Sequence, residues 1–552
     1  MKKLINYFAR RPKTSFTLLA LAGLLAFLLY PLGSPQFRIV FDEAKIKAKK
    51  DYLDLLKGVY QTRNFEQRAY VRRPNIVLIV ADDLAWSDVS LQGNSLVPTP
   101  NIDGIAKRGA QLTEGYITSP ICSPSRAGLL TGRYQQRFGY EYQPHARYPN
   151  NRLEYYVYKW FIARGDWRVS DRLPVPQPED MLKQGLPPTE IILPELLKNH
   201  DYATAIIGKW HLGTQHFTLP LQRGFDYHYG FYEAYSLYYA DTSGANVINH
   251  RHTDFSDKFI WGKGRTGNCA IYKNTQVVQD STYLTHKIAD EAVNFIHENR
   301  EKPFFLYVPF LAPHTPFQVP KETFDKYAHI ADRNKRVYCA LIDELDRSFG
   351  KIRDAISTHG LDENTIIIFL SDNGGARYTG AVDNAPFKGG KFSNFEGGLR
   401  VPFFIEWKGQ IPANTIYTQP ASSLDIFATL CHILQIELPQ DRTYDGVNLL
   451  PYLLGQNTEA PHKALFWRSG YHKAVRFGDW KLIKDEKAQL KALYNIKNDK
   501  EEQQDLSTAE PARVAELEKM LQDCERDMVP PAWVNVMDYH IKDGERTYYF
   551  PL

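Results

Sequence analysis

Four short apolar runs, each stopping abruptly at polar residues, constrain the fold of this chain more than any other feature. None of the runs alternates with polar residues, which is typical of strands buried on both faces of a parallel sheet. Residues 76–81 lead into Asp82 and Asp83, residues 204–207 into Gly208 and Lys209, residues 304–308 towards His314, and residues 366–370 into Ser371 and Asp372. Ligands of such sheets bind beyond the carboxyl ends of the strands, so these polar residues mark a candidate site.

Helical patterns between the runs complete the βα alternation of a largely parallel sheet. They cover residues 195–200, 290–299 and 341–357. After Leu453 the pattern changes to short alternating strands, followed by a helix at residues 509–526. We therefore expect an α/β fold, with a large, mostly parallel sheet sandwiched by helices and a smaller C-terminal α+β domain that carries an antiparallel sheet. The expected limits are residues 73–455 for the main domain and 456–552 for the C-terminal subdomain.

The N-terminus has the pattern of a targeting segment. Basic residues precede an apolar run at residues 16–32, which is close to the ~17 residues that a membrane helix needs. We interpret residues 1–36 as a signal anchor, with a cleaved signal peptide and secretion as the alternative. The charged residues 37–72 are expected to form a stalk. The basic flank should stay inside, and the chain has no Asn-x-Ser/Thr sequon, so we expect an exported, bacterial periplasmic protein held to the inner membrane.

Composition excludes several other classes of protein. Hydrophobic residues make up 43% and charged residues 24%, which is ordinary for a folded enzyme. The formal charge of +4 is spread along the chain, whereas a nucleic-acid partner would call for a larger and more clustered basic excess. The 5 cysteines are scattered and form no CxxC pair, which argues against a disulfide scaffold or a structural zinc module.

The most specific motif lies at residues 122–133 and reads Cys-Ser-Pro-Ser-Arg-Ala-Gly-Leu-Leu-Thr-Gly-Arg. Pro124 suits the first turn of a helix, and Ser123 is a suitable cap. Cys122 is then expected at a helix N-terminus, where backbone N–H groups and the helix dipole favour a bound anion. Arg126, one turn further on, can hold that anion or position the nucleophile. For the other four cysteines, a small buried hydrophobe is the simpler interpretation.

This motif resembles the signature of the formylglycine-dependent (type I) sulfatases of the alkaline phosphatase superfamily. The resemblance extends from about Arg73 to Leu506, so residues 73–455 are read as the sulfatase catalytic domain. Matching segments are Asp82-Asp83-Leu84, the Gly-Lys-Trp-His-Leu-Gly run at 208–213, Pro313-His314-Thr315-Pro316, Ser371-Asp372-Asn373-Gly374, Gly390-Lys391 and residues 396–400. Ala85 and Ser87 stand where the family usually has glycine, and this leaves the metal-binding positions intact.

The resemblance implies the chemistry of the site. In the family the motif cysteine is oxidised to formylglycine by a maturation enzyme, and the hydrated aldehyde attacks the sulfate ester. Asp82, Asp83, Asp372 and Asn373, with the modified Cys122, would bind one divalent cation. These oxygen ligands select Ca²⁺, or less readily Mg²⁺, over zinc.

Roles for the remaining site residues follow from the same resemblance. Lys209 would contact the nucleophile and the sulfate. His211 would remove a proton so that sulfate is expelled and the aldehyde restored. His314 and Lys391 would lie on the leaving-group side, with His314 as the proton donor. The expected partner is a sulfated small molecule or glycan.

Two points stay open from the sequence. The aromatic and basic stretch at residues 142–187 is either a packing excursion or a substrate-side insertion whose rings stack on sugars or aryl groups. A phosphate- or phosphonate-ester hydrolase of the same superfamily is the main alternative activity, because tetrahedral oxyanions share geometry. A sulfatase-like binding protein without turnover should show a broken site, and here every expected position is filled.

Overall fold

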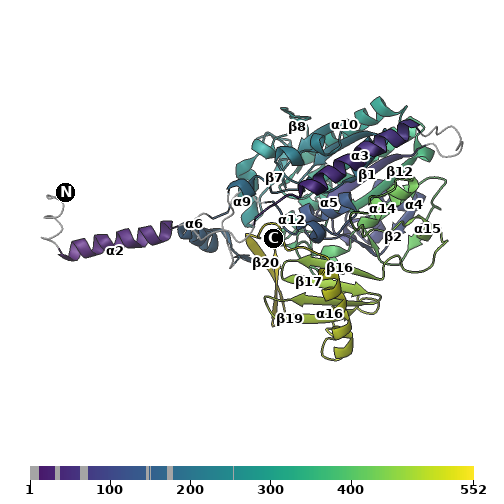
Figure 1. Ribbon diagram of the computed structural model, residues 1–552. Coiled ribbons are helices and arrows are strands. Elements are labelled where there is room, and N and C mark those ends of the chain that lie inside the picture. Colours follow the sequence, from purple (N-terminus) through teal and green to yellow (C-terminus); the bar gives the residue numbers. More distant parts are fainter. Residues whose placement is uncertain are drawn as a thin grey trace.

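A 10-stranded sheet forms the centre of the larger domain, in the order β14-β2-β13-β12-β1-β10-β5-β6-β8-β9 (Figure 1). The computed structural model describes residues 12–30, 38–62, 73–144, 148–149, 151–170, 178–252 and 254–552. The four apolar runs are adjacent parallel strands in the middle of this sheet: β12 (Thr365–Ser371), β1 (Asn75–Asp82), β10 (Phe304–Pro313) and β5 (Ala203–Lys209). The predicted fold class is confirmed.

The outer strands make the sheet mixed. On one side β6 (Tyr227–Phe231) runs parallel to β5, followed by the short antiparallel pair β8 (Tyr272–Lys273) and β9 (Gln276–Val277). On the other side β13 (Phe403–Trp407) is antiparallel to β12 and to β2 (Ala110–Leu112), which runs parallel to β14 (Thr415–Tyr417). The parallel strands therefore occupy the fully buried centre, as their apolar sequences require.

Each face of the sheet has its own hydrophobic core because successive side chains of a strand point to opposite faces. Ile76 and Leu78 pack on the face covered by α5 (Cys122–Thr131), α8 (Leu193–Lys198) and α14 (Leu424–Ile433). Val77 and Ile79 pack on the other face, under α4 (Pro100–Arg108), α10 (Leu284–Asn299) and α12 (Arg333–Thr358). Helices thus cover both faces and leave the strand ends free for a site.

Short elements complete this domain. They are β3 (Gly115–Tyr116), α6 (Arg152–Val157), η5 (Tyr158–Ile162), α7 (Pro178–Met181), β7 (Val247–His250), α9 (Phe255–Lys263), β11 (Phe317–Pro320), α11 (Lys321–Lys326), α13 (Glu396–Leu399), β15 (Ala421–Ser422) and α15 (Leu450–Leu453).

The C-terminal part carries the predicted antiparallel sheet. Its strands β16 (Ala464–Ser469), β17 (His472–Phe477), β18 (Trp480–Asp485) and β19 (Leu490–Asn495) pair in sequence order, and α16 (Pro511–Glu525) packs on one face. A second small sheet joins β20 (Met537–Asp543) and β21 (Arg546–Pro551) to β4 (Trp167–Val169). The stretch at residues 142–187 is therefore tied to the C-terminus of the chain.

Part of the segment predicted as a stalk forms α3 (Glu43–Thr62), which lies along the main body (Figure 1). Lys49 on this helix is buried, and its Nζ donates to the Glu190 carbonyl and to Glu195 Oε1 at 2.7 and 2.6 Å. The hydroxyl of Tyr52 donates to the carbonyl of Glu437 at 2.7 Å. The helix is thus held to the domain by polar contacts.

The predicted membrane anchor at residues 16–32 is not supported. Residues 12–29 form α2 (Pro12–Leu29), and residues 31–32 of the predicted span lie outside the residues that the structure describes. Within the part of the chain that the structure describes, no helix combines the length and hydrophobicity needed to cross a membrane. Export to the periplasm stays a prediction.

A buried ion network joins the two parts of the molecule. Lys481 of β18 lies 2.9 Å from Glu396 Oε1 and 2.9 Å from Glu502 Oε1, and all three side chains are fully buried. Glu502 also accepts a hydrogen bond from the Glu396 backbone N–H at 2.7 Å. The C-terminal sheet therefore neutralises carboxylates next to α13, which belongs to the larger domain.

We expect Lys481→Met to lower the free energy of unfolding by about 3–5 kcal/mol, because it removes the cation that two buried carboxylates share and leaves Glu396 with the longer 3.6 Å pair to Arg400. Denaturant titration measures the change. Lys484→Met on the same strand is the matched control, since Lys484 is partly exposed and lies 3.5–3.6 Å from its carboxylate partners. It should cost less than about 1 kcal/mol. Equal losses of unfolding free energy in both variants would show that the buried network contributes no more to stability than an exposed ion pair.

Candidate active site

Polar residues at the ends of β1 and β12 meet at the carboxyl edge of the sheet. The two strands are parallel neighbours with Ala81 opposite Ser371, so Asp82 and Asp83 lie beside Asp372 and Asn373. Asp83 adopts a φ of 65°, and its carbonyl accepts a hydrogen bond from the Tyr338 hydroxyl at 3.0 Å. Asn373 Nδ2 donates to Asp83 Oδ1 at 2.7 Å. The sheet register therefore gathers the four predicted metal-binding residues.

Cys122 begins α5 and faces the same edge. Its side chain is buried, being 1% exposed, and Ile121 occupies the N-cap position without a side-chain cap. Ser123 does not cap the helix as predicted. Its hydroxyl instead bonds to the Tyr140 hydroxyl at 2.7 Å and to the His211 carbonyl at 2.5 Å, because it already lies inside the first turn. Ser123 thus links α5 to the segment that carries His211.

Three cations pair with the three aspartates around Cys122. Lys209 Nζ lies 2.5 Å from Asp82 Oδ2, and both side chains are fully buried. Arg126 places Nε and Nη2 at 2.8 and 2.7 Å from Asp372 Oδ2. Lys391 Nζ lies 2.8 Å from Asp83 Oδ1. The motif residues are therefore one electrically balanced cluster, assembled from β1, β5, β12, α5 and the loop after residue 389.

The oxygen atoms of this cluster fit a hard divalent cation. Ligand atoms of Asp82, Asp83, Cys122 and His314 all lie within 4.8 Å of one another. Asp82 Oδ1 and Asn373 Oδ1 are buried and have no hydrogen-bond partner. Buried oxygens without a donor are costly unless a ligand supplies the positive charge. Asp372 is outside that 4.8 Å group, although it directly follows β12, the parallel neighbour of β1.

The two predicted histidines have different neighbours in the cluster. Burial, followed by the charges of Lys209 and Arg126, lowers the pKa of His211 well below its ordinary value, which makes it a neutral base. His314 Nδ1 bonds to the Thr315 carbonyl at 2.5 Å, so this nitrogen carries the proton. Its Nε2 lies 3.6 Å from Asp83 Oδ2. Burial and Lys391 lower the pKa of His314 to about 4.

A cavity of about 270 Å³ opens beside His211. Its wall includes Gln184, Gln215, Glu233 and Asn268, together with Pro144, Met181, Leu182, Gly213, Thr214 and Tyr232. The stretch at residues 142–187 contributes four of these residues, but not the aromatic ones. Of the aromatic residues in this stretch, Trp167 packs against Tyr378, Phe392 and Tyr539, with ring centroids 5.2–5.5 Å apart, as the packing alternative expects. Apart from Gly213, which ends the Gly-Lys-Trp-His-Leu-Gly run, no motif marks these cavity residues, so the sequence does not identify them.

Comparisons with known proteins agree with this geometry. The Sulfatase family model matches residues 74–436. Human steryl-sulfatase is 31% identical over 466 residues, covering 73% of this chain and 74% of that protein. Mouse N-acetylgalactosamine-6-sulfatase is 32% identical over 415 residues, covering 74% of this chain and 71% of that protein.

Among solved structures, Ps i-CgsB in complex with k-i-k-neocarrahexaose superposes with a TM-score of 0.69 at 31% identity, covering 84% of this chain and 95% of that one. The phosphonate monoester hydrolase of Agrobacterium radiobacter, at 20% identity and a TM-score of 0.54, covers 87% of this chain and 100% of that one and shows the shared fold alone. The family match and the relatives above confirm the resemblance predicted from the motifs: the chain belongs to the sulfatase family and is a sulfatase.

Proposed function

We propose that this sulfatase hydrolyses sulfate esters of sulfated glycans through a formylglycine made from Cys122. The observation that carries the proposal is the buried position of Cys122 within the balanced cluster of cations and aspartates. A glycan substrate is supported by similarity to an N-acetylgalactosamine-6-sulfatase and to a structure bound to a neocarrahexaose.

The electrostatics of Cys122 favour the modified residue over the free thiol. Burial raises the pKa of the thiol to about 12, so at neutral pH the side chain is protonated and a poor nucleophile. The hydroxyl of a hydrated aldehyde can be regenerated by elimination, whereas a sulfated thiol or serine would be a stable dead end. A formylglycine-generating maturation enzyme is therefore the partner that the site requires.

Asp82, Asp83, Asp372 and Asn373, with the modified Cys122, would hold one Ca²⁺, with Mg²⁺ as the weaker candidate. When bound, such an ion polarises a sulfate oxygen and the nucleophile. Arg126, Lys209 and Lys391 surround the same space with positive charge. They would neutralise the sulfate oxygens and hold the ester in line with the nucleophile.

The histidines would move protons at two different atoms. The negative charge of a bound sulfate ester favours protonated His314, which can then donate its Nε2 proton to the departing alcohol oxygen. Neutral His211 would accept the proton of the second hydroxyl at position 122 as the bond to sulfate breaks. The different neighbours of the two histidines support this division of labour: His314 lies next to Asp83 and Lys391, whereas the charges of Lys209 and Arg126 act on His211.

A phosphate- or phosphonate-ester preference is the competing activity, motivated by the shared fold of the phosphonate monoester hydrolase. Ratios of kcat/KM for nitrophenyl sulfate and nitrophenyl phosphate decide between them. We expect the sulfate ester to be preferred, because three aspartates already balance the three cations and a dianionic phosphate adds more negative charge.

Mass spectrometry of active protein should find formylglycine in the peptide that contains Cys122, with a mass loss relative to cysteine and with aldehyde reactivity. Cys122→Ala should abolish turnover, because no nucleophile remains. Cys269→Ser removes another buried thiol and should leave kcat almost unchanged, which makes it the matched control. Full activity in protein whose Cys122 is an unmodified thiol would overturn the mechanism.

Asp83→Ala and Asp372→Ala should lower bound calcium and kcat together, because both remove oxygen ligands. Elemental analysis of purified protein gives the metal content. The exposed Asp354 on α12 supplies the control Asp354→Ala, which should keep both metal and rate. A chelated, metal-free enzyme that retained its rate, or a purified enzyme holding zinc, would refute the assignment.

His314→Ala should reduce kcat about 10²–10⁴-fold for sulfated sugars but far less for nitrophenyl sulfate, whose leaving group needs little protonation. His211→Ala should give one fast turnover and then trap sulfate on residue 122. Burst kinetics followed by mass spectrometry of the Cys122 peptide distinguishes the effect of His314→Ala from that of His211→Ala. Equal losses on every leaving group, with no trapped sulfate in either variant, would disprove the division between the histidines.

A further inference from the structure

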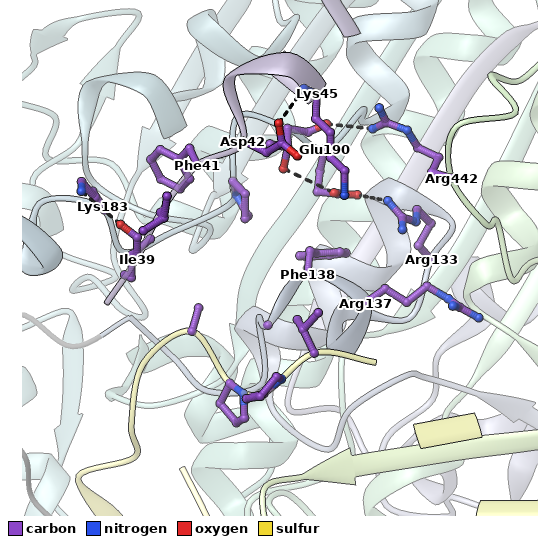
Figure 2. Close-up of a pocket in the computed structure, with 18 of the residues that line it drawn as sticks. Ile39, Phe41, Asp42, Lys45, Arg133, Arg137, Phe138, Lys183, Glu190 and Arg442 are labelled. Carbon is purple, nitrogen blue, oxygen red and sulfur yellow. Dashed lines mark hydrogen bonds and ion pairs between the residues drawn. The ribbon is translucent and has the colours of Figure 1, made fainter. Parts of the chain in front are cut away.

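A second, larger cavity of about 810 Å³ lies near the C-terminal end of α5, away from Cys122 (Figure 2). Arg133, two residues beyond the end of α5, lines it, so this wall is about 15 Å from Cys122 by the rise of a ten-residue helix. We call it the basic cavity. Its charged lining residues are Arg38, Asp42, Lys45, Arg133, Arg137, Lys183, Glu190, Asp441, Arg442 and Asp527.

Half of the cations in the basic cavity are held by carboxylates. Arg133 lies 2.6 Å from Glu190, Arg137 lies 2.7 Å from Asp445, and Arg442 lies 2.7 Å from Asp441. Arg38, Lys45 and Lys183 have no carboxylate partner among the residues that the structure describes. Lys183 Nζ instead donates to the carbonyl of Ile39 at 3.0 Å.

Two of the four lining carboxylates, Glu190 and Asp441, are neutralised by these pairs. Asp42 Oδ1 accepts the backbone N–H groups of Ala44 and Lys45 at the start of α3. Asp527 is exposed. The cavity therefore offers more uncommitted positive charge than negative charge, which suits an anionic ligand.

Aromatic rings complete the lining. Phe41 and Phe138 are both half-buried residues of the cavity wall; in the view of Figure 2, Phe138 lies below Arg133, and Phe41 lies on the opposite side, above Lys183 and Ile39. An apolar ring face beside cations matches a sugar ring that carries anionic substituents, since the ring packs on carbon faces while the charges meet arginine or lysine. A free inorganic anion would gain nothing from the rings.

The basic cavity and the cavity beside His211 share one wall. Met181, Leu182 and Gln184 line the cavity next to His211, while Lys183 and Gly185 line the basic cavity. Leu182 is 61% exposed, so the ridge between the two is open to solvent. A chain molecule whose one end lies at His211 can therefore pass over this ridge and place a later unit beside Lys183.

We propose that the basic cavity binds a second anionic sugar of the same glycan whose sulfate ester lies at Cys122, which makes polyanionic oligosaccharides the preferred substrates over single sulfated sugars. This inference rests on the proposed sulfate-ester hydrolysis and deepens it. Binding at the two cavities would be intramolecular once the ester end is seated, so each uncommitted cation adds to the affinity for long chains only.

The test compares two double variants of the full, matured chain. Arg38→Ala/Lys45→Ala removes two exposed cations from the basic cavity. The matched control is Lys47→Ala/Lys50→Ala. It removes two exposed cations from α3, the helix that carries Lys45, and neither of them lines the basic cavity. Substrates are nitrophenyl sulfate and carrageenan- and chondroitin-sulfate-derived fragments of two, four and six sugars.

We expect kcat/KM of the parent to rise with chain length on the glycan that it hydrolyses best. Arg38→Ala/Lys45→Ala should lower kcat/KM for the longest fragment about fivefold to tenfold, mainly through KM, and leave nitrophenyl sulfate unchanged. High salt should remove the difference from the parent. Lys183→Gln, which keeps a donor for Ile39 but loses the charge, should act in the same direction.

The inference is overturned if the parent hydrolyses nitrophenyl sulfate but shows no preference for longer fragments of any glycan, or if both double variants lose the same activity. Failure of the proposed function looks different, because then the parent itself hydrolyses neither nitrophenyl sulfate nor any fragment.

Discussion

The buried pairing of three cations with three aspartates is the interaction on which the rest of the structure depends. A charge without a partner in such an interior costs several kcal/mol, so each of these side chains can exist only where its partner also arrives. Lys209 ends β5, Asp82 ends β1 and Arg126 projects from α5. The register of the parallel strands and the seating of α5 on the sheet must therefore be correct together. Packing alone tolerates small shifts, whereas this cluster does not.

The same pairing explains how the site can be stable and reactive at once. Without a ligand, Asp82 and Lys209 neutralise one another, as do Asp83 and Lys391. Under the proposed function, a divalent cation would compete for the aspartate oxygens and a sulfate ester for the lysine and arginine nitrogens, so the two ligands would replace the internal pairs with external ones. Asp82 Oδ1 and Asn373 Oδ1, which lack donors, mark where the exchange is least costly. Binding of the cation and of the ester should therefore reinforce each other.

Most of the central sheet can be predicted from the sequence, but few of the peripheral segments can. The run at residues 366–370 predicts a buried parallel strand because nothing in it can face water, and the structure places it there as β12. Cys122, Lys209 and His314 are also recognisable from the sequence, because each stands in a fixed motif. By contrast, Gln184, Glu233 and Asn268 meet only through tertiary folding, and their loops have no periodicity to read. The prediction that Ser123 caps α5 is wrong. Cap preference depends only on local sequence, and here the Ser123 hydroxyl bonds to the His211 carbonyl instead.

Under the proposed function, catalysis and substrate choice would reside in different parts of the chain. The reacting groups stand on strand ends and on α5, which the sheet fixes in place. The basic cavity takes much of its wall from segments outside the sheet: residues 38–45 before it, residues 183–190 within an excursion, and residues 527–533 after the C-terminal helix. These segments hold one another through contacts such as Asp180 with the Ile39 N–H at 3.0 Å and Lys183 with its carbonyl. A change in any of them can alter which glycan is bound while leaving the charge balance at Cys122 untouched.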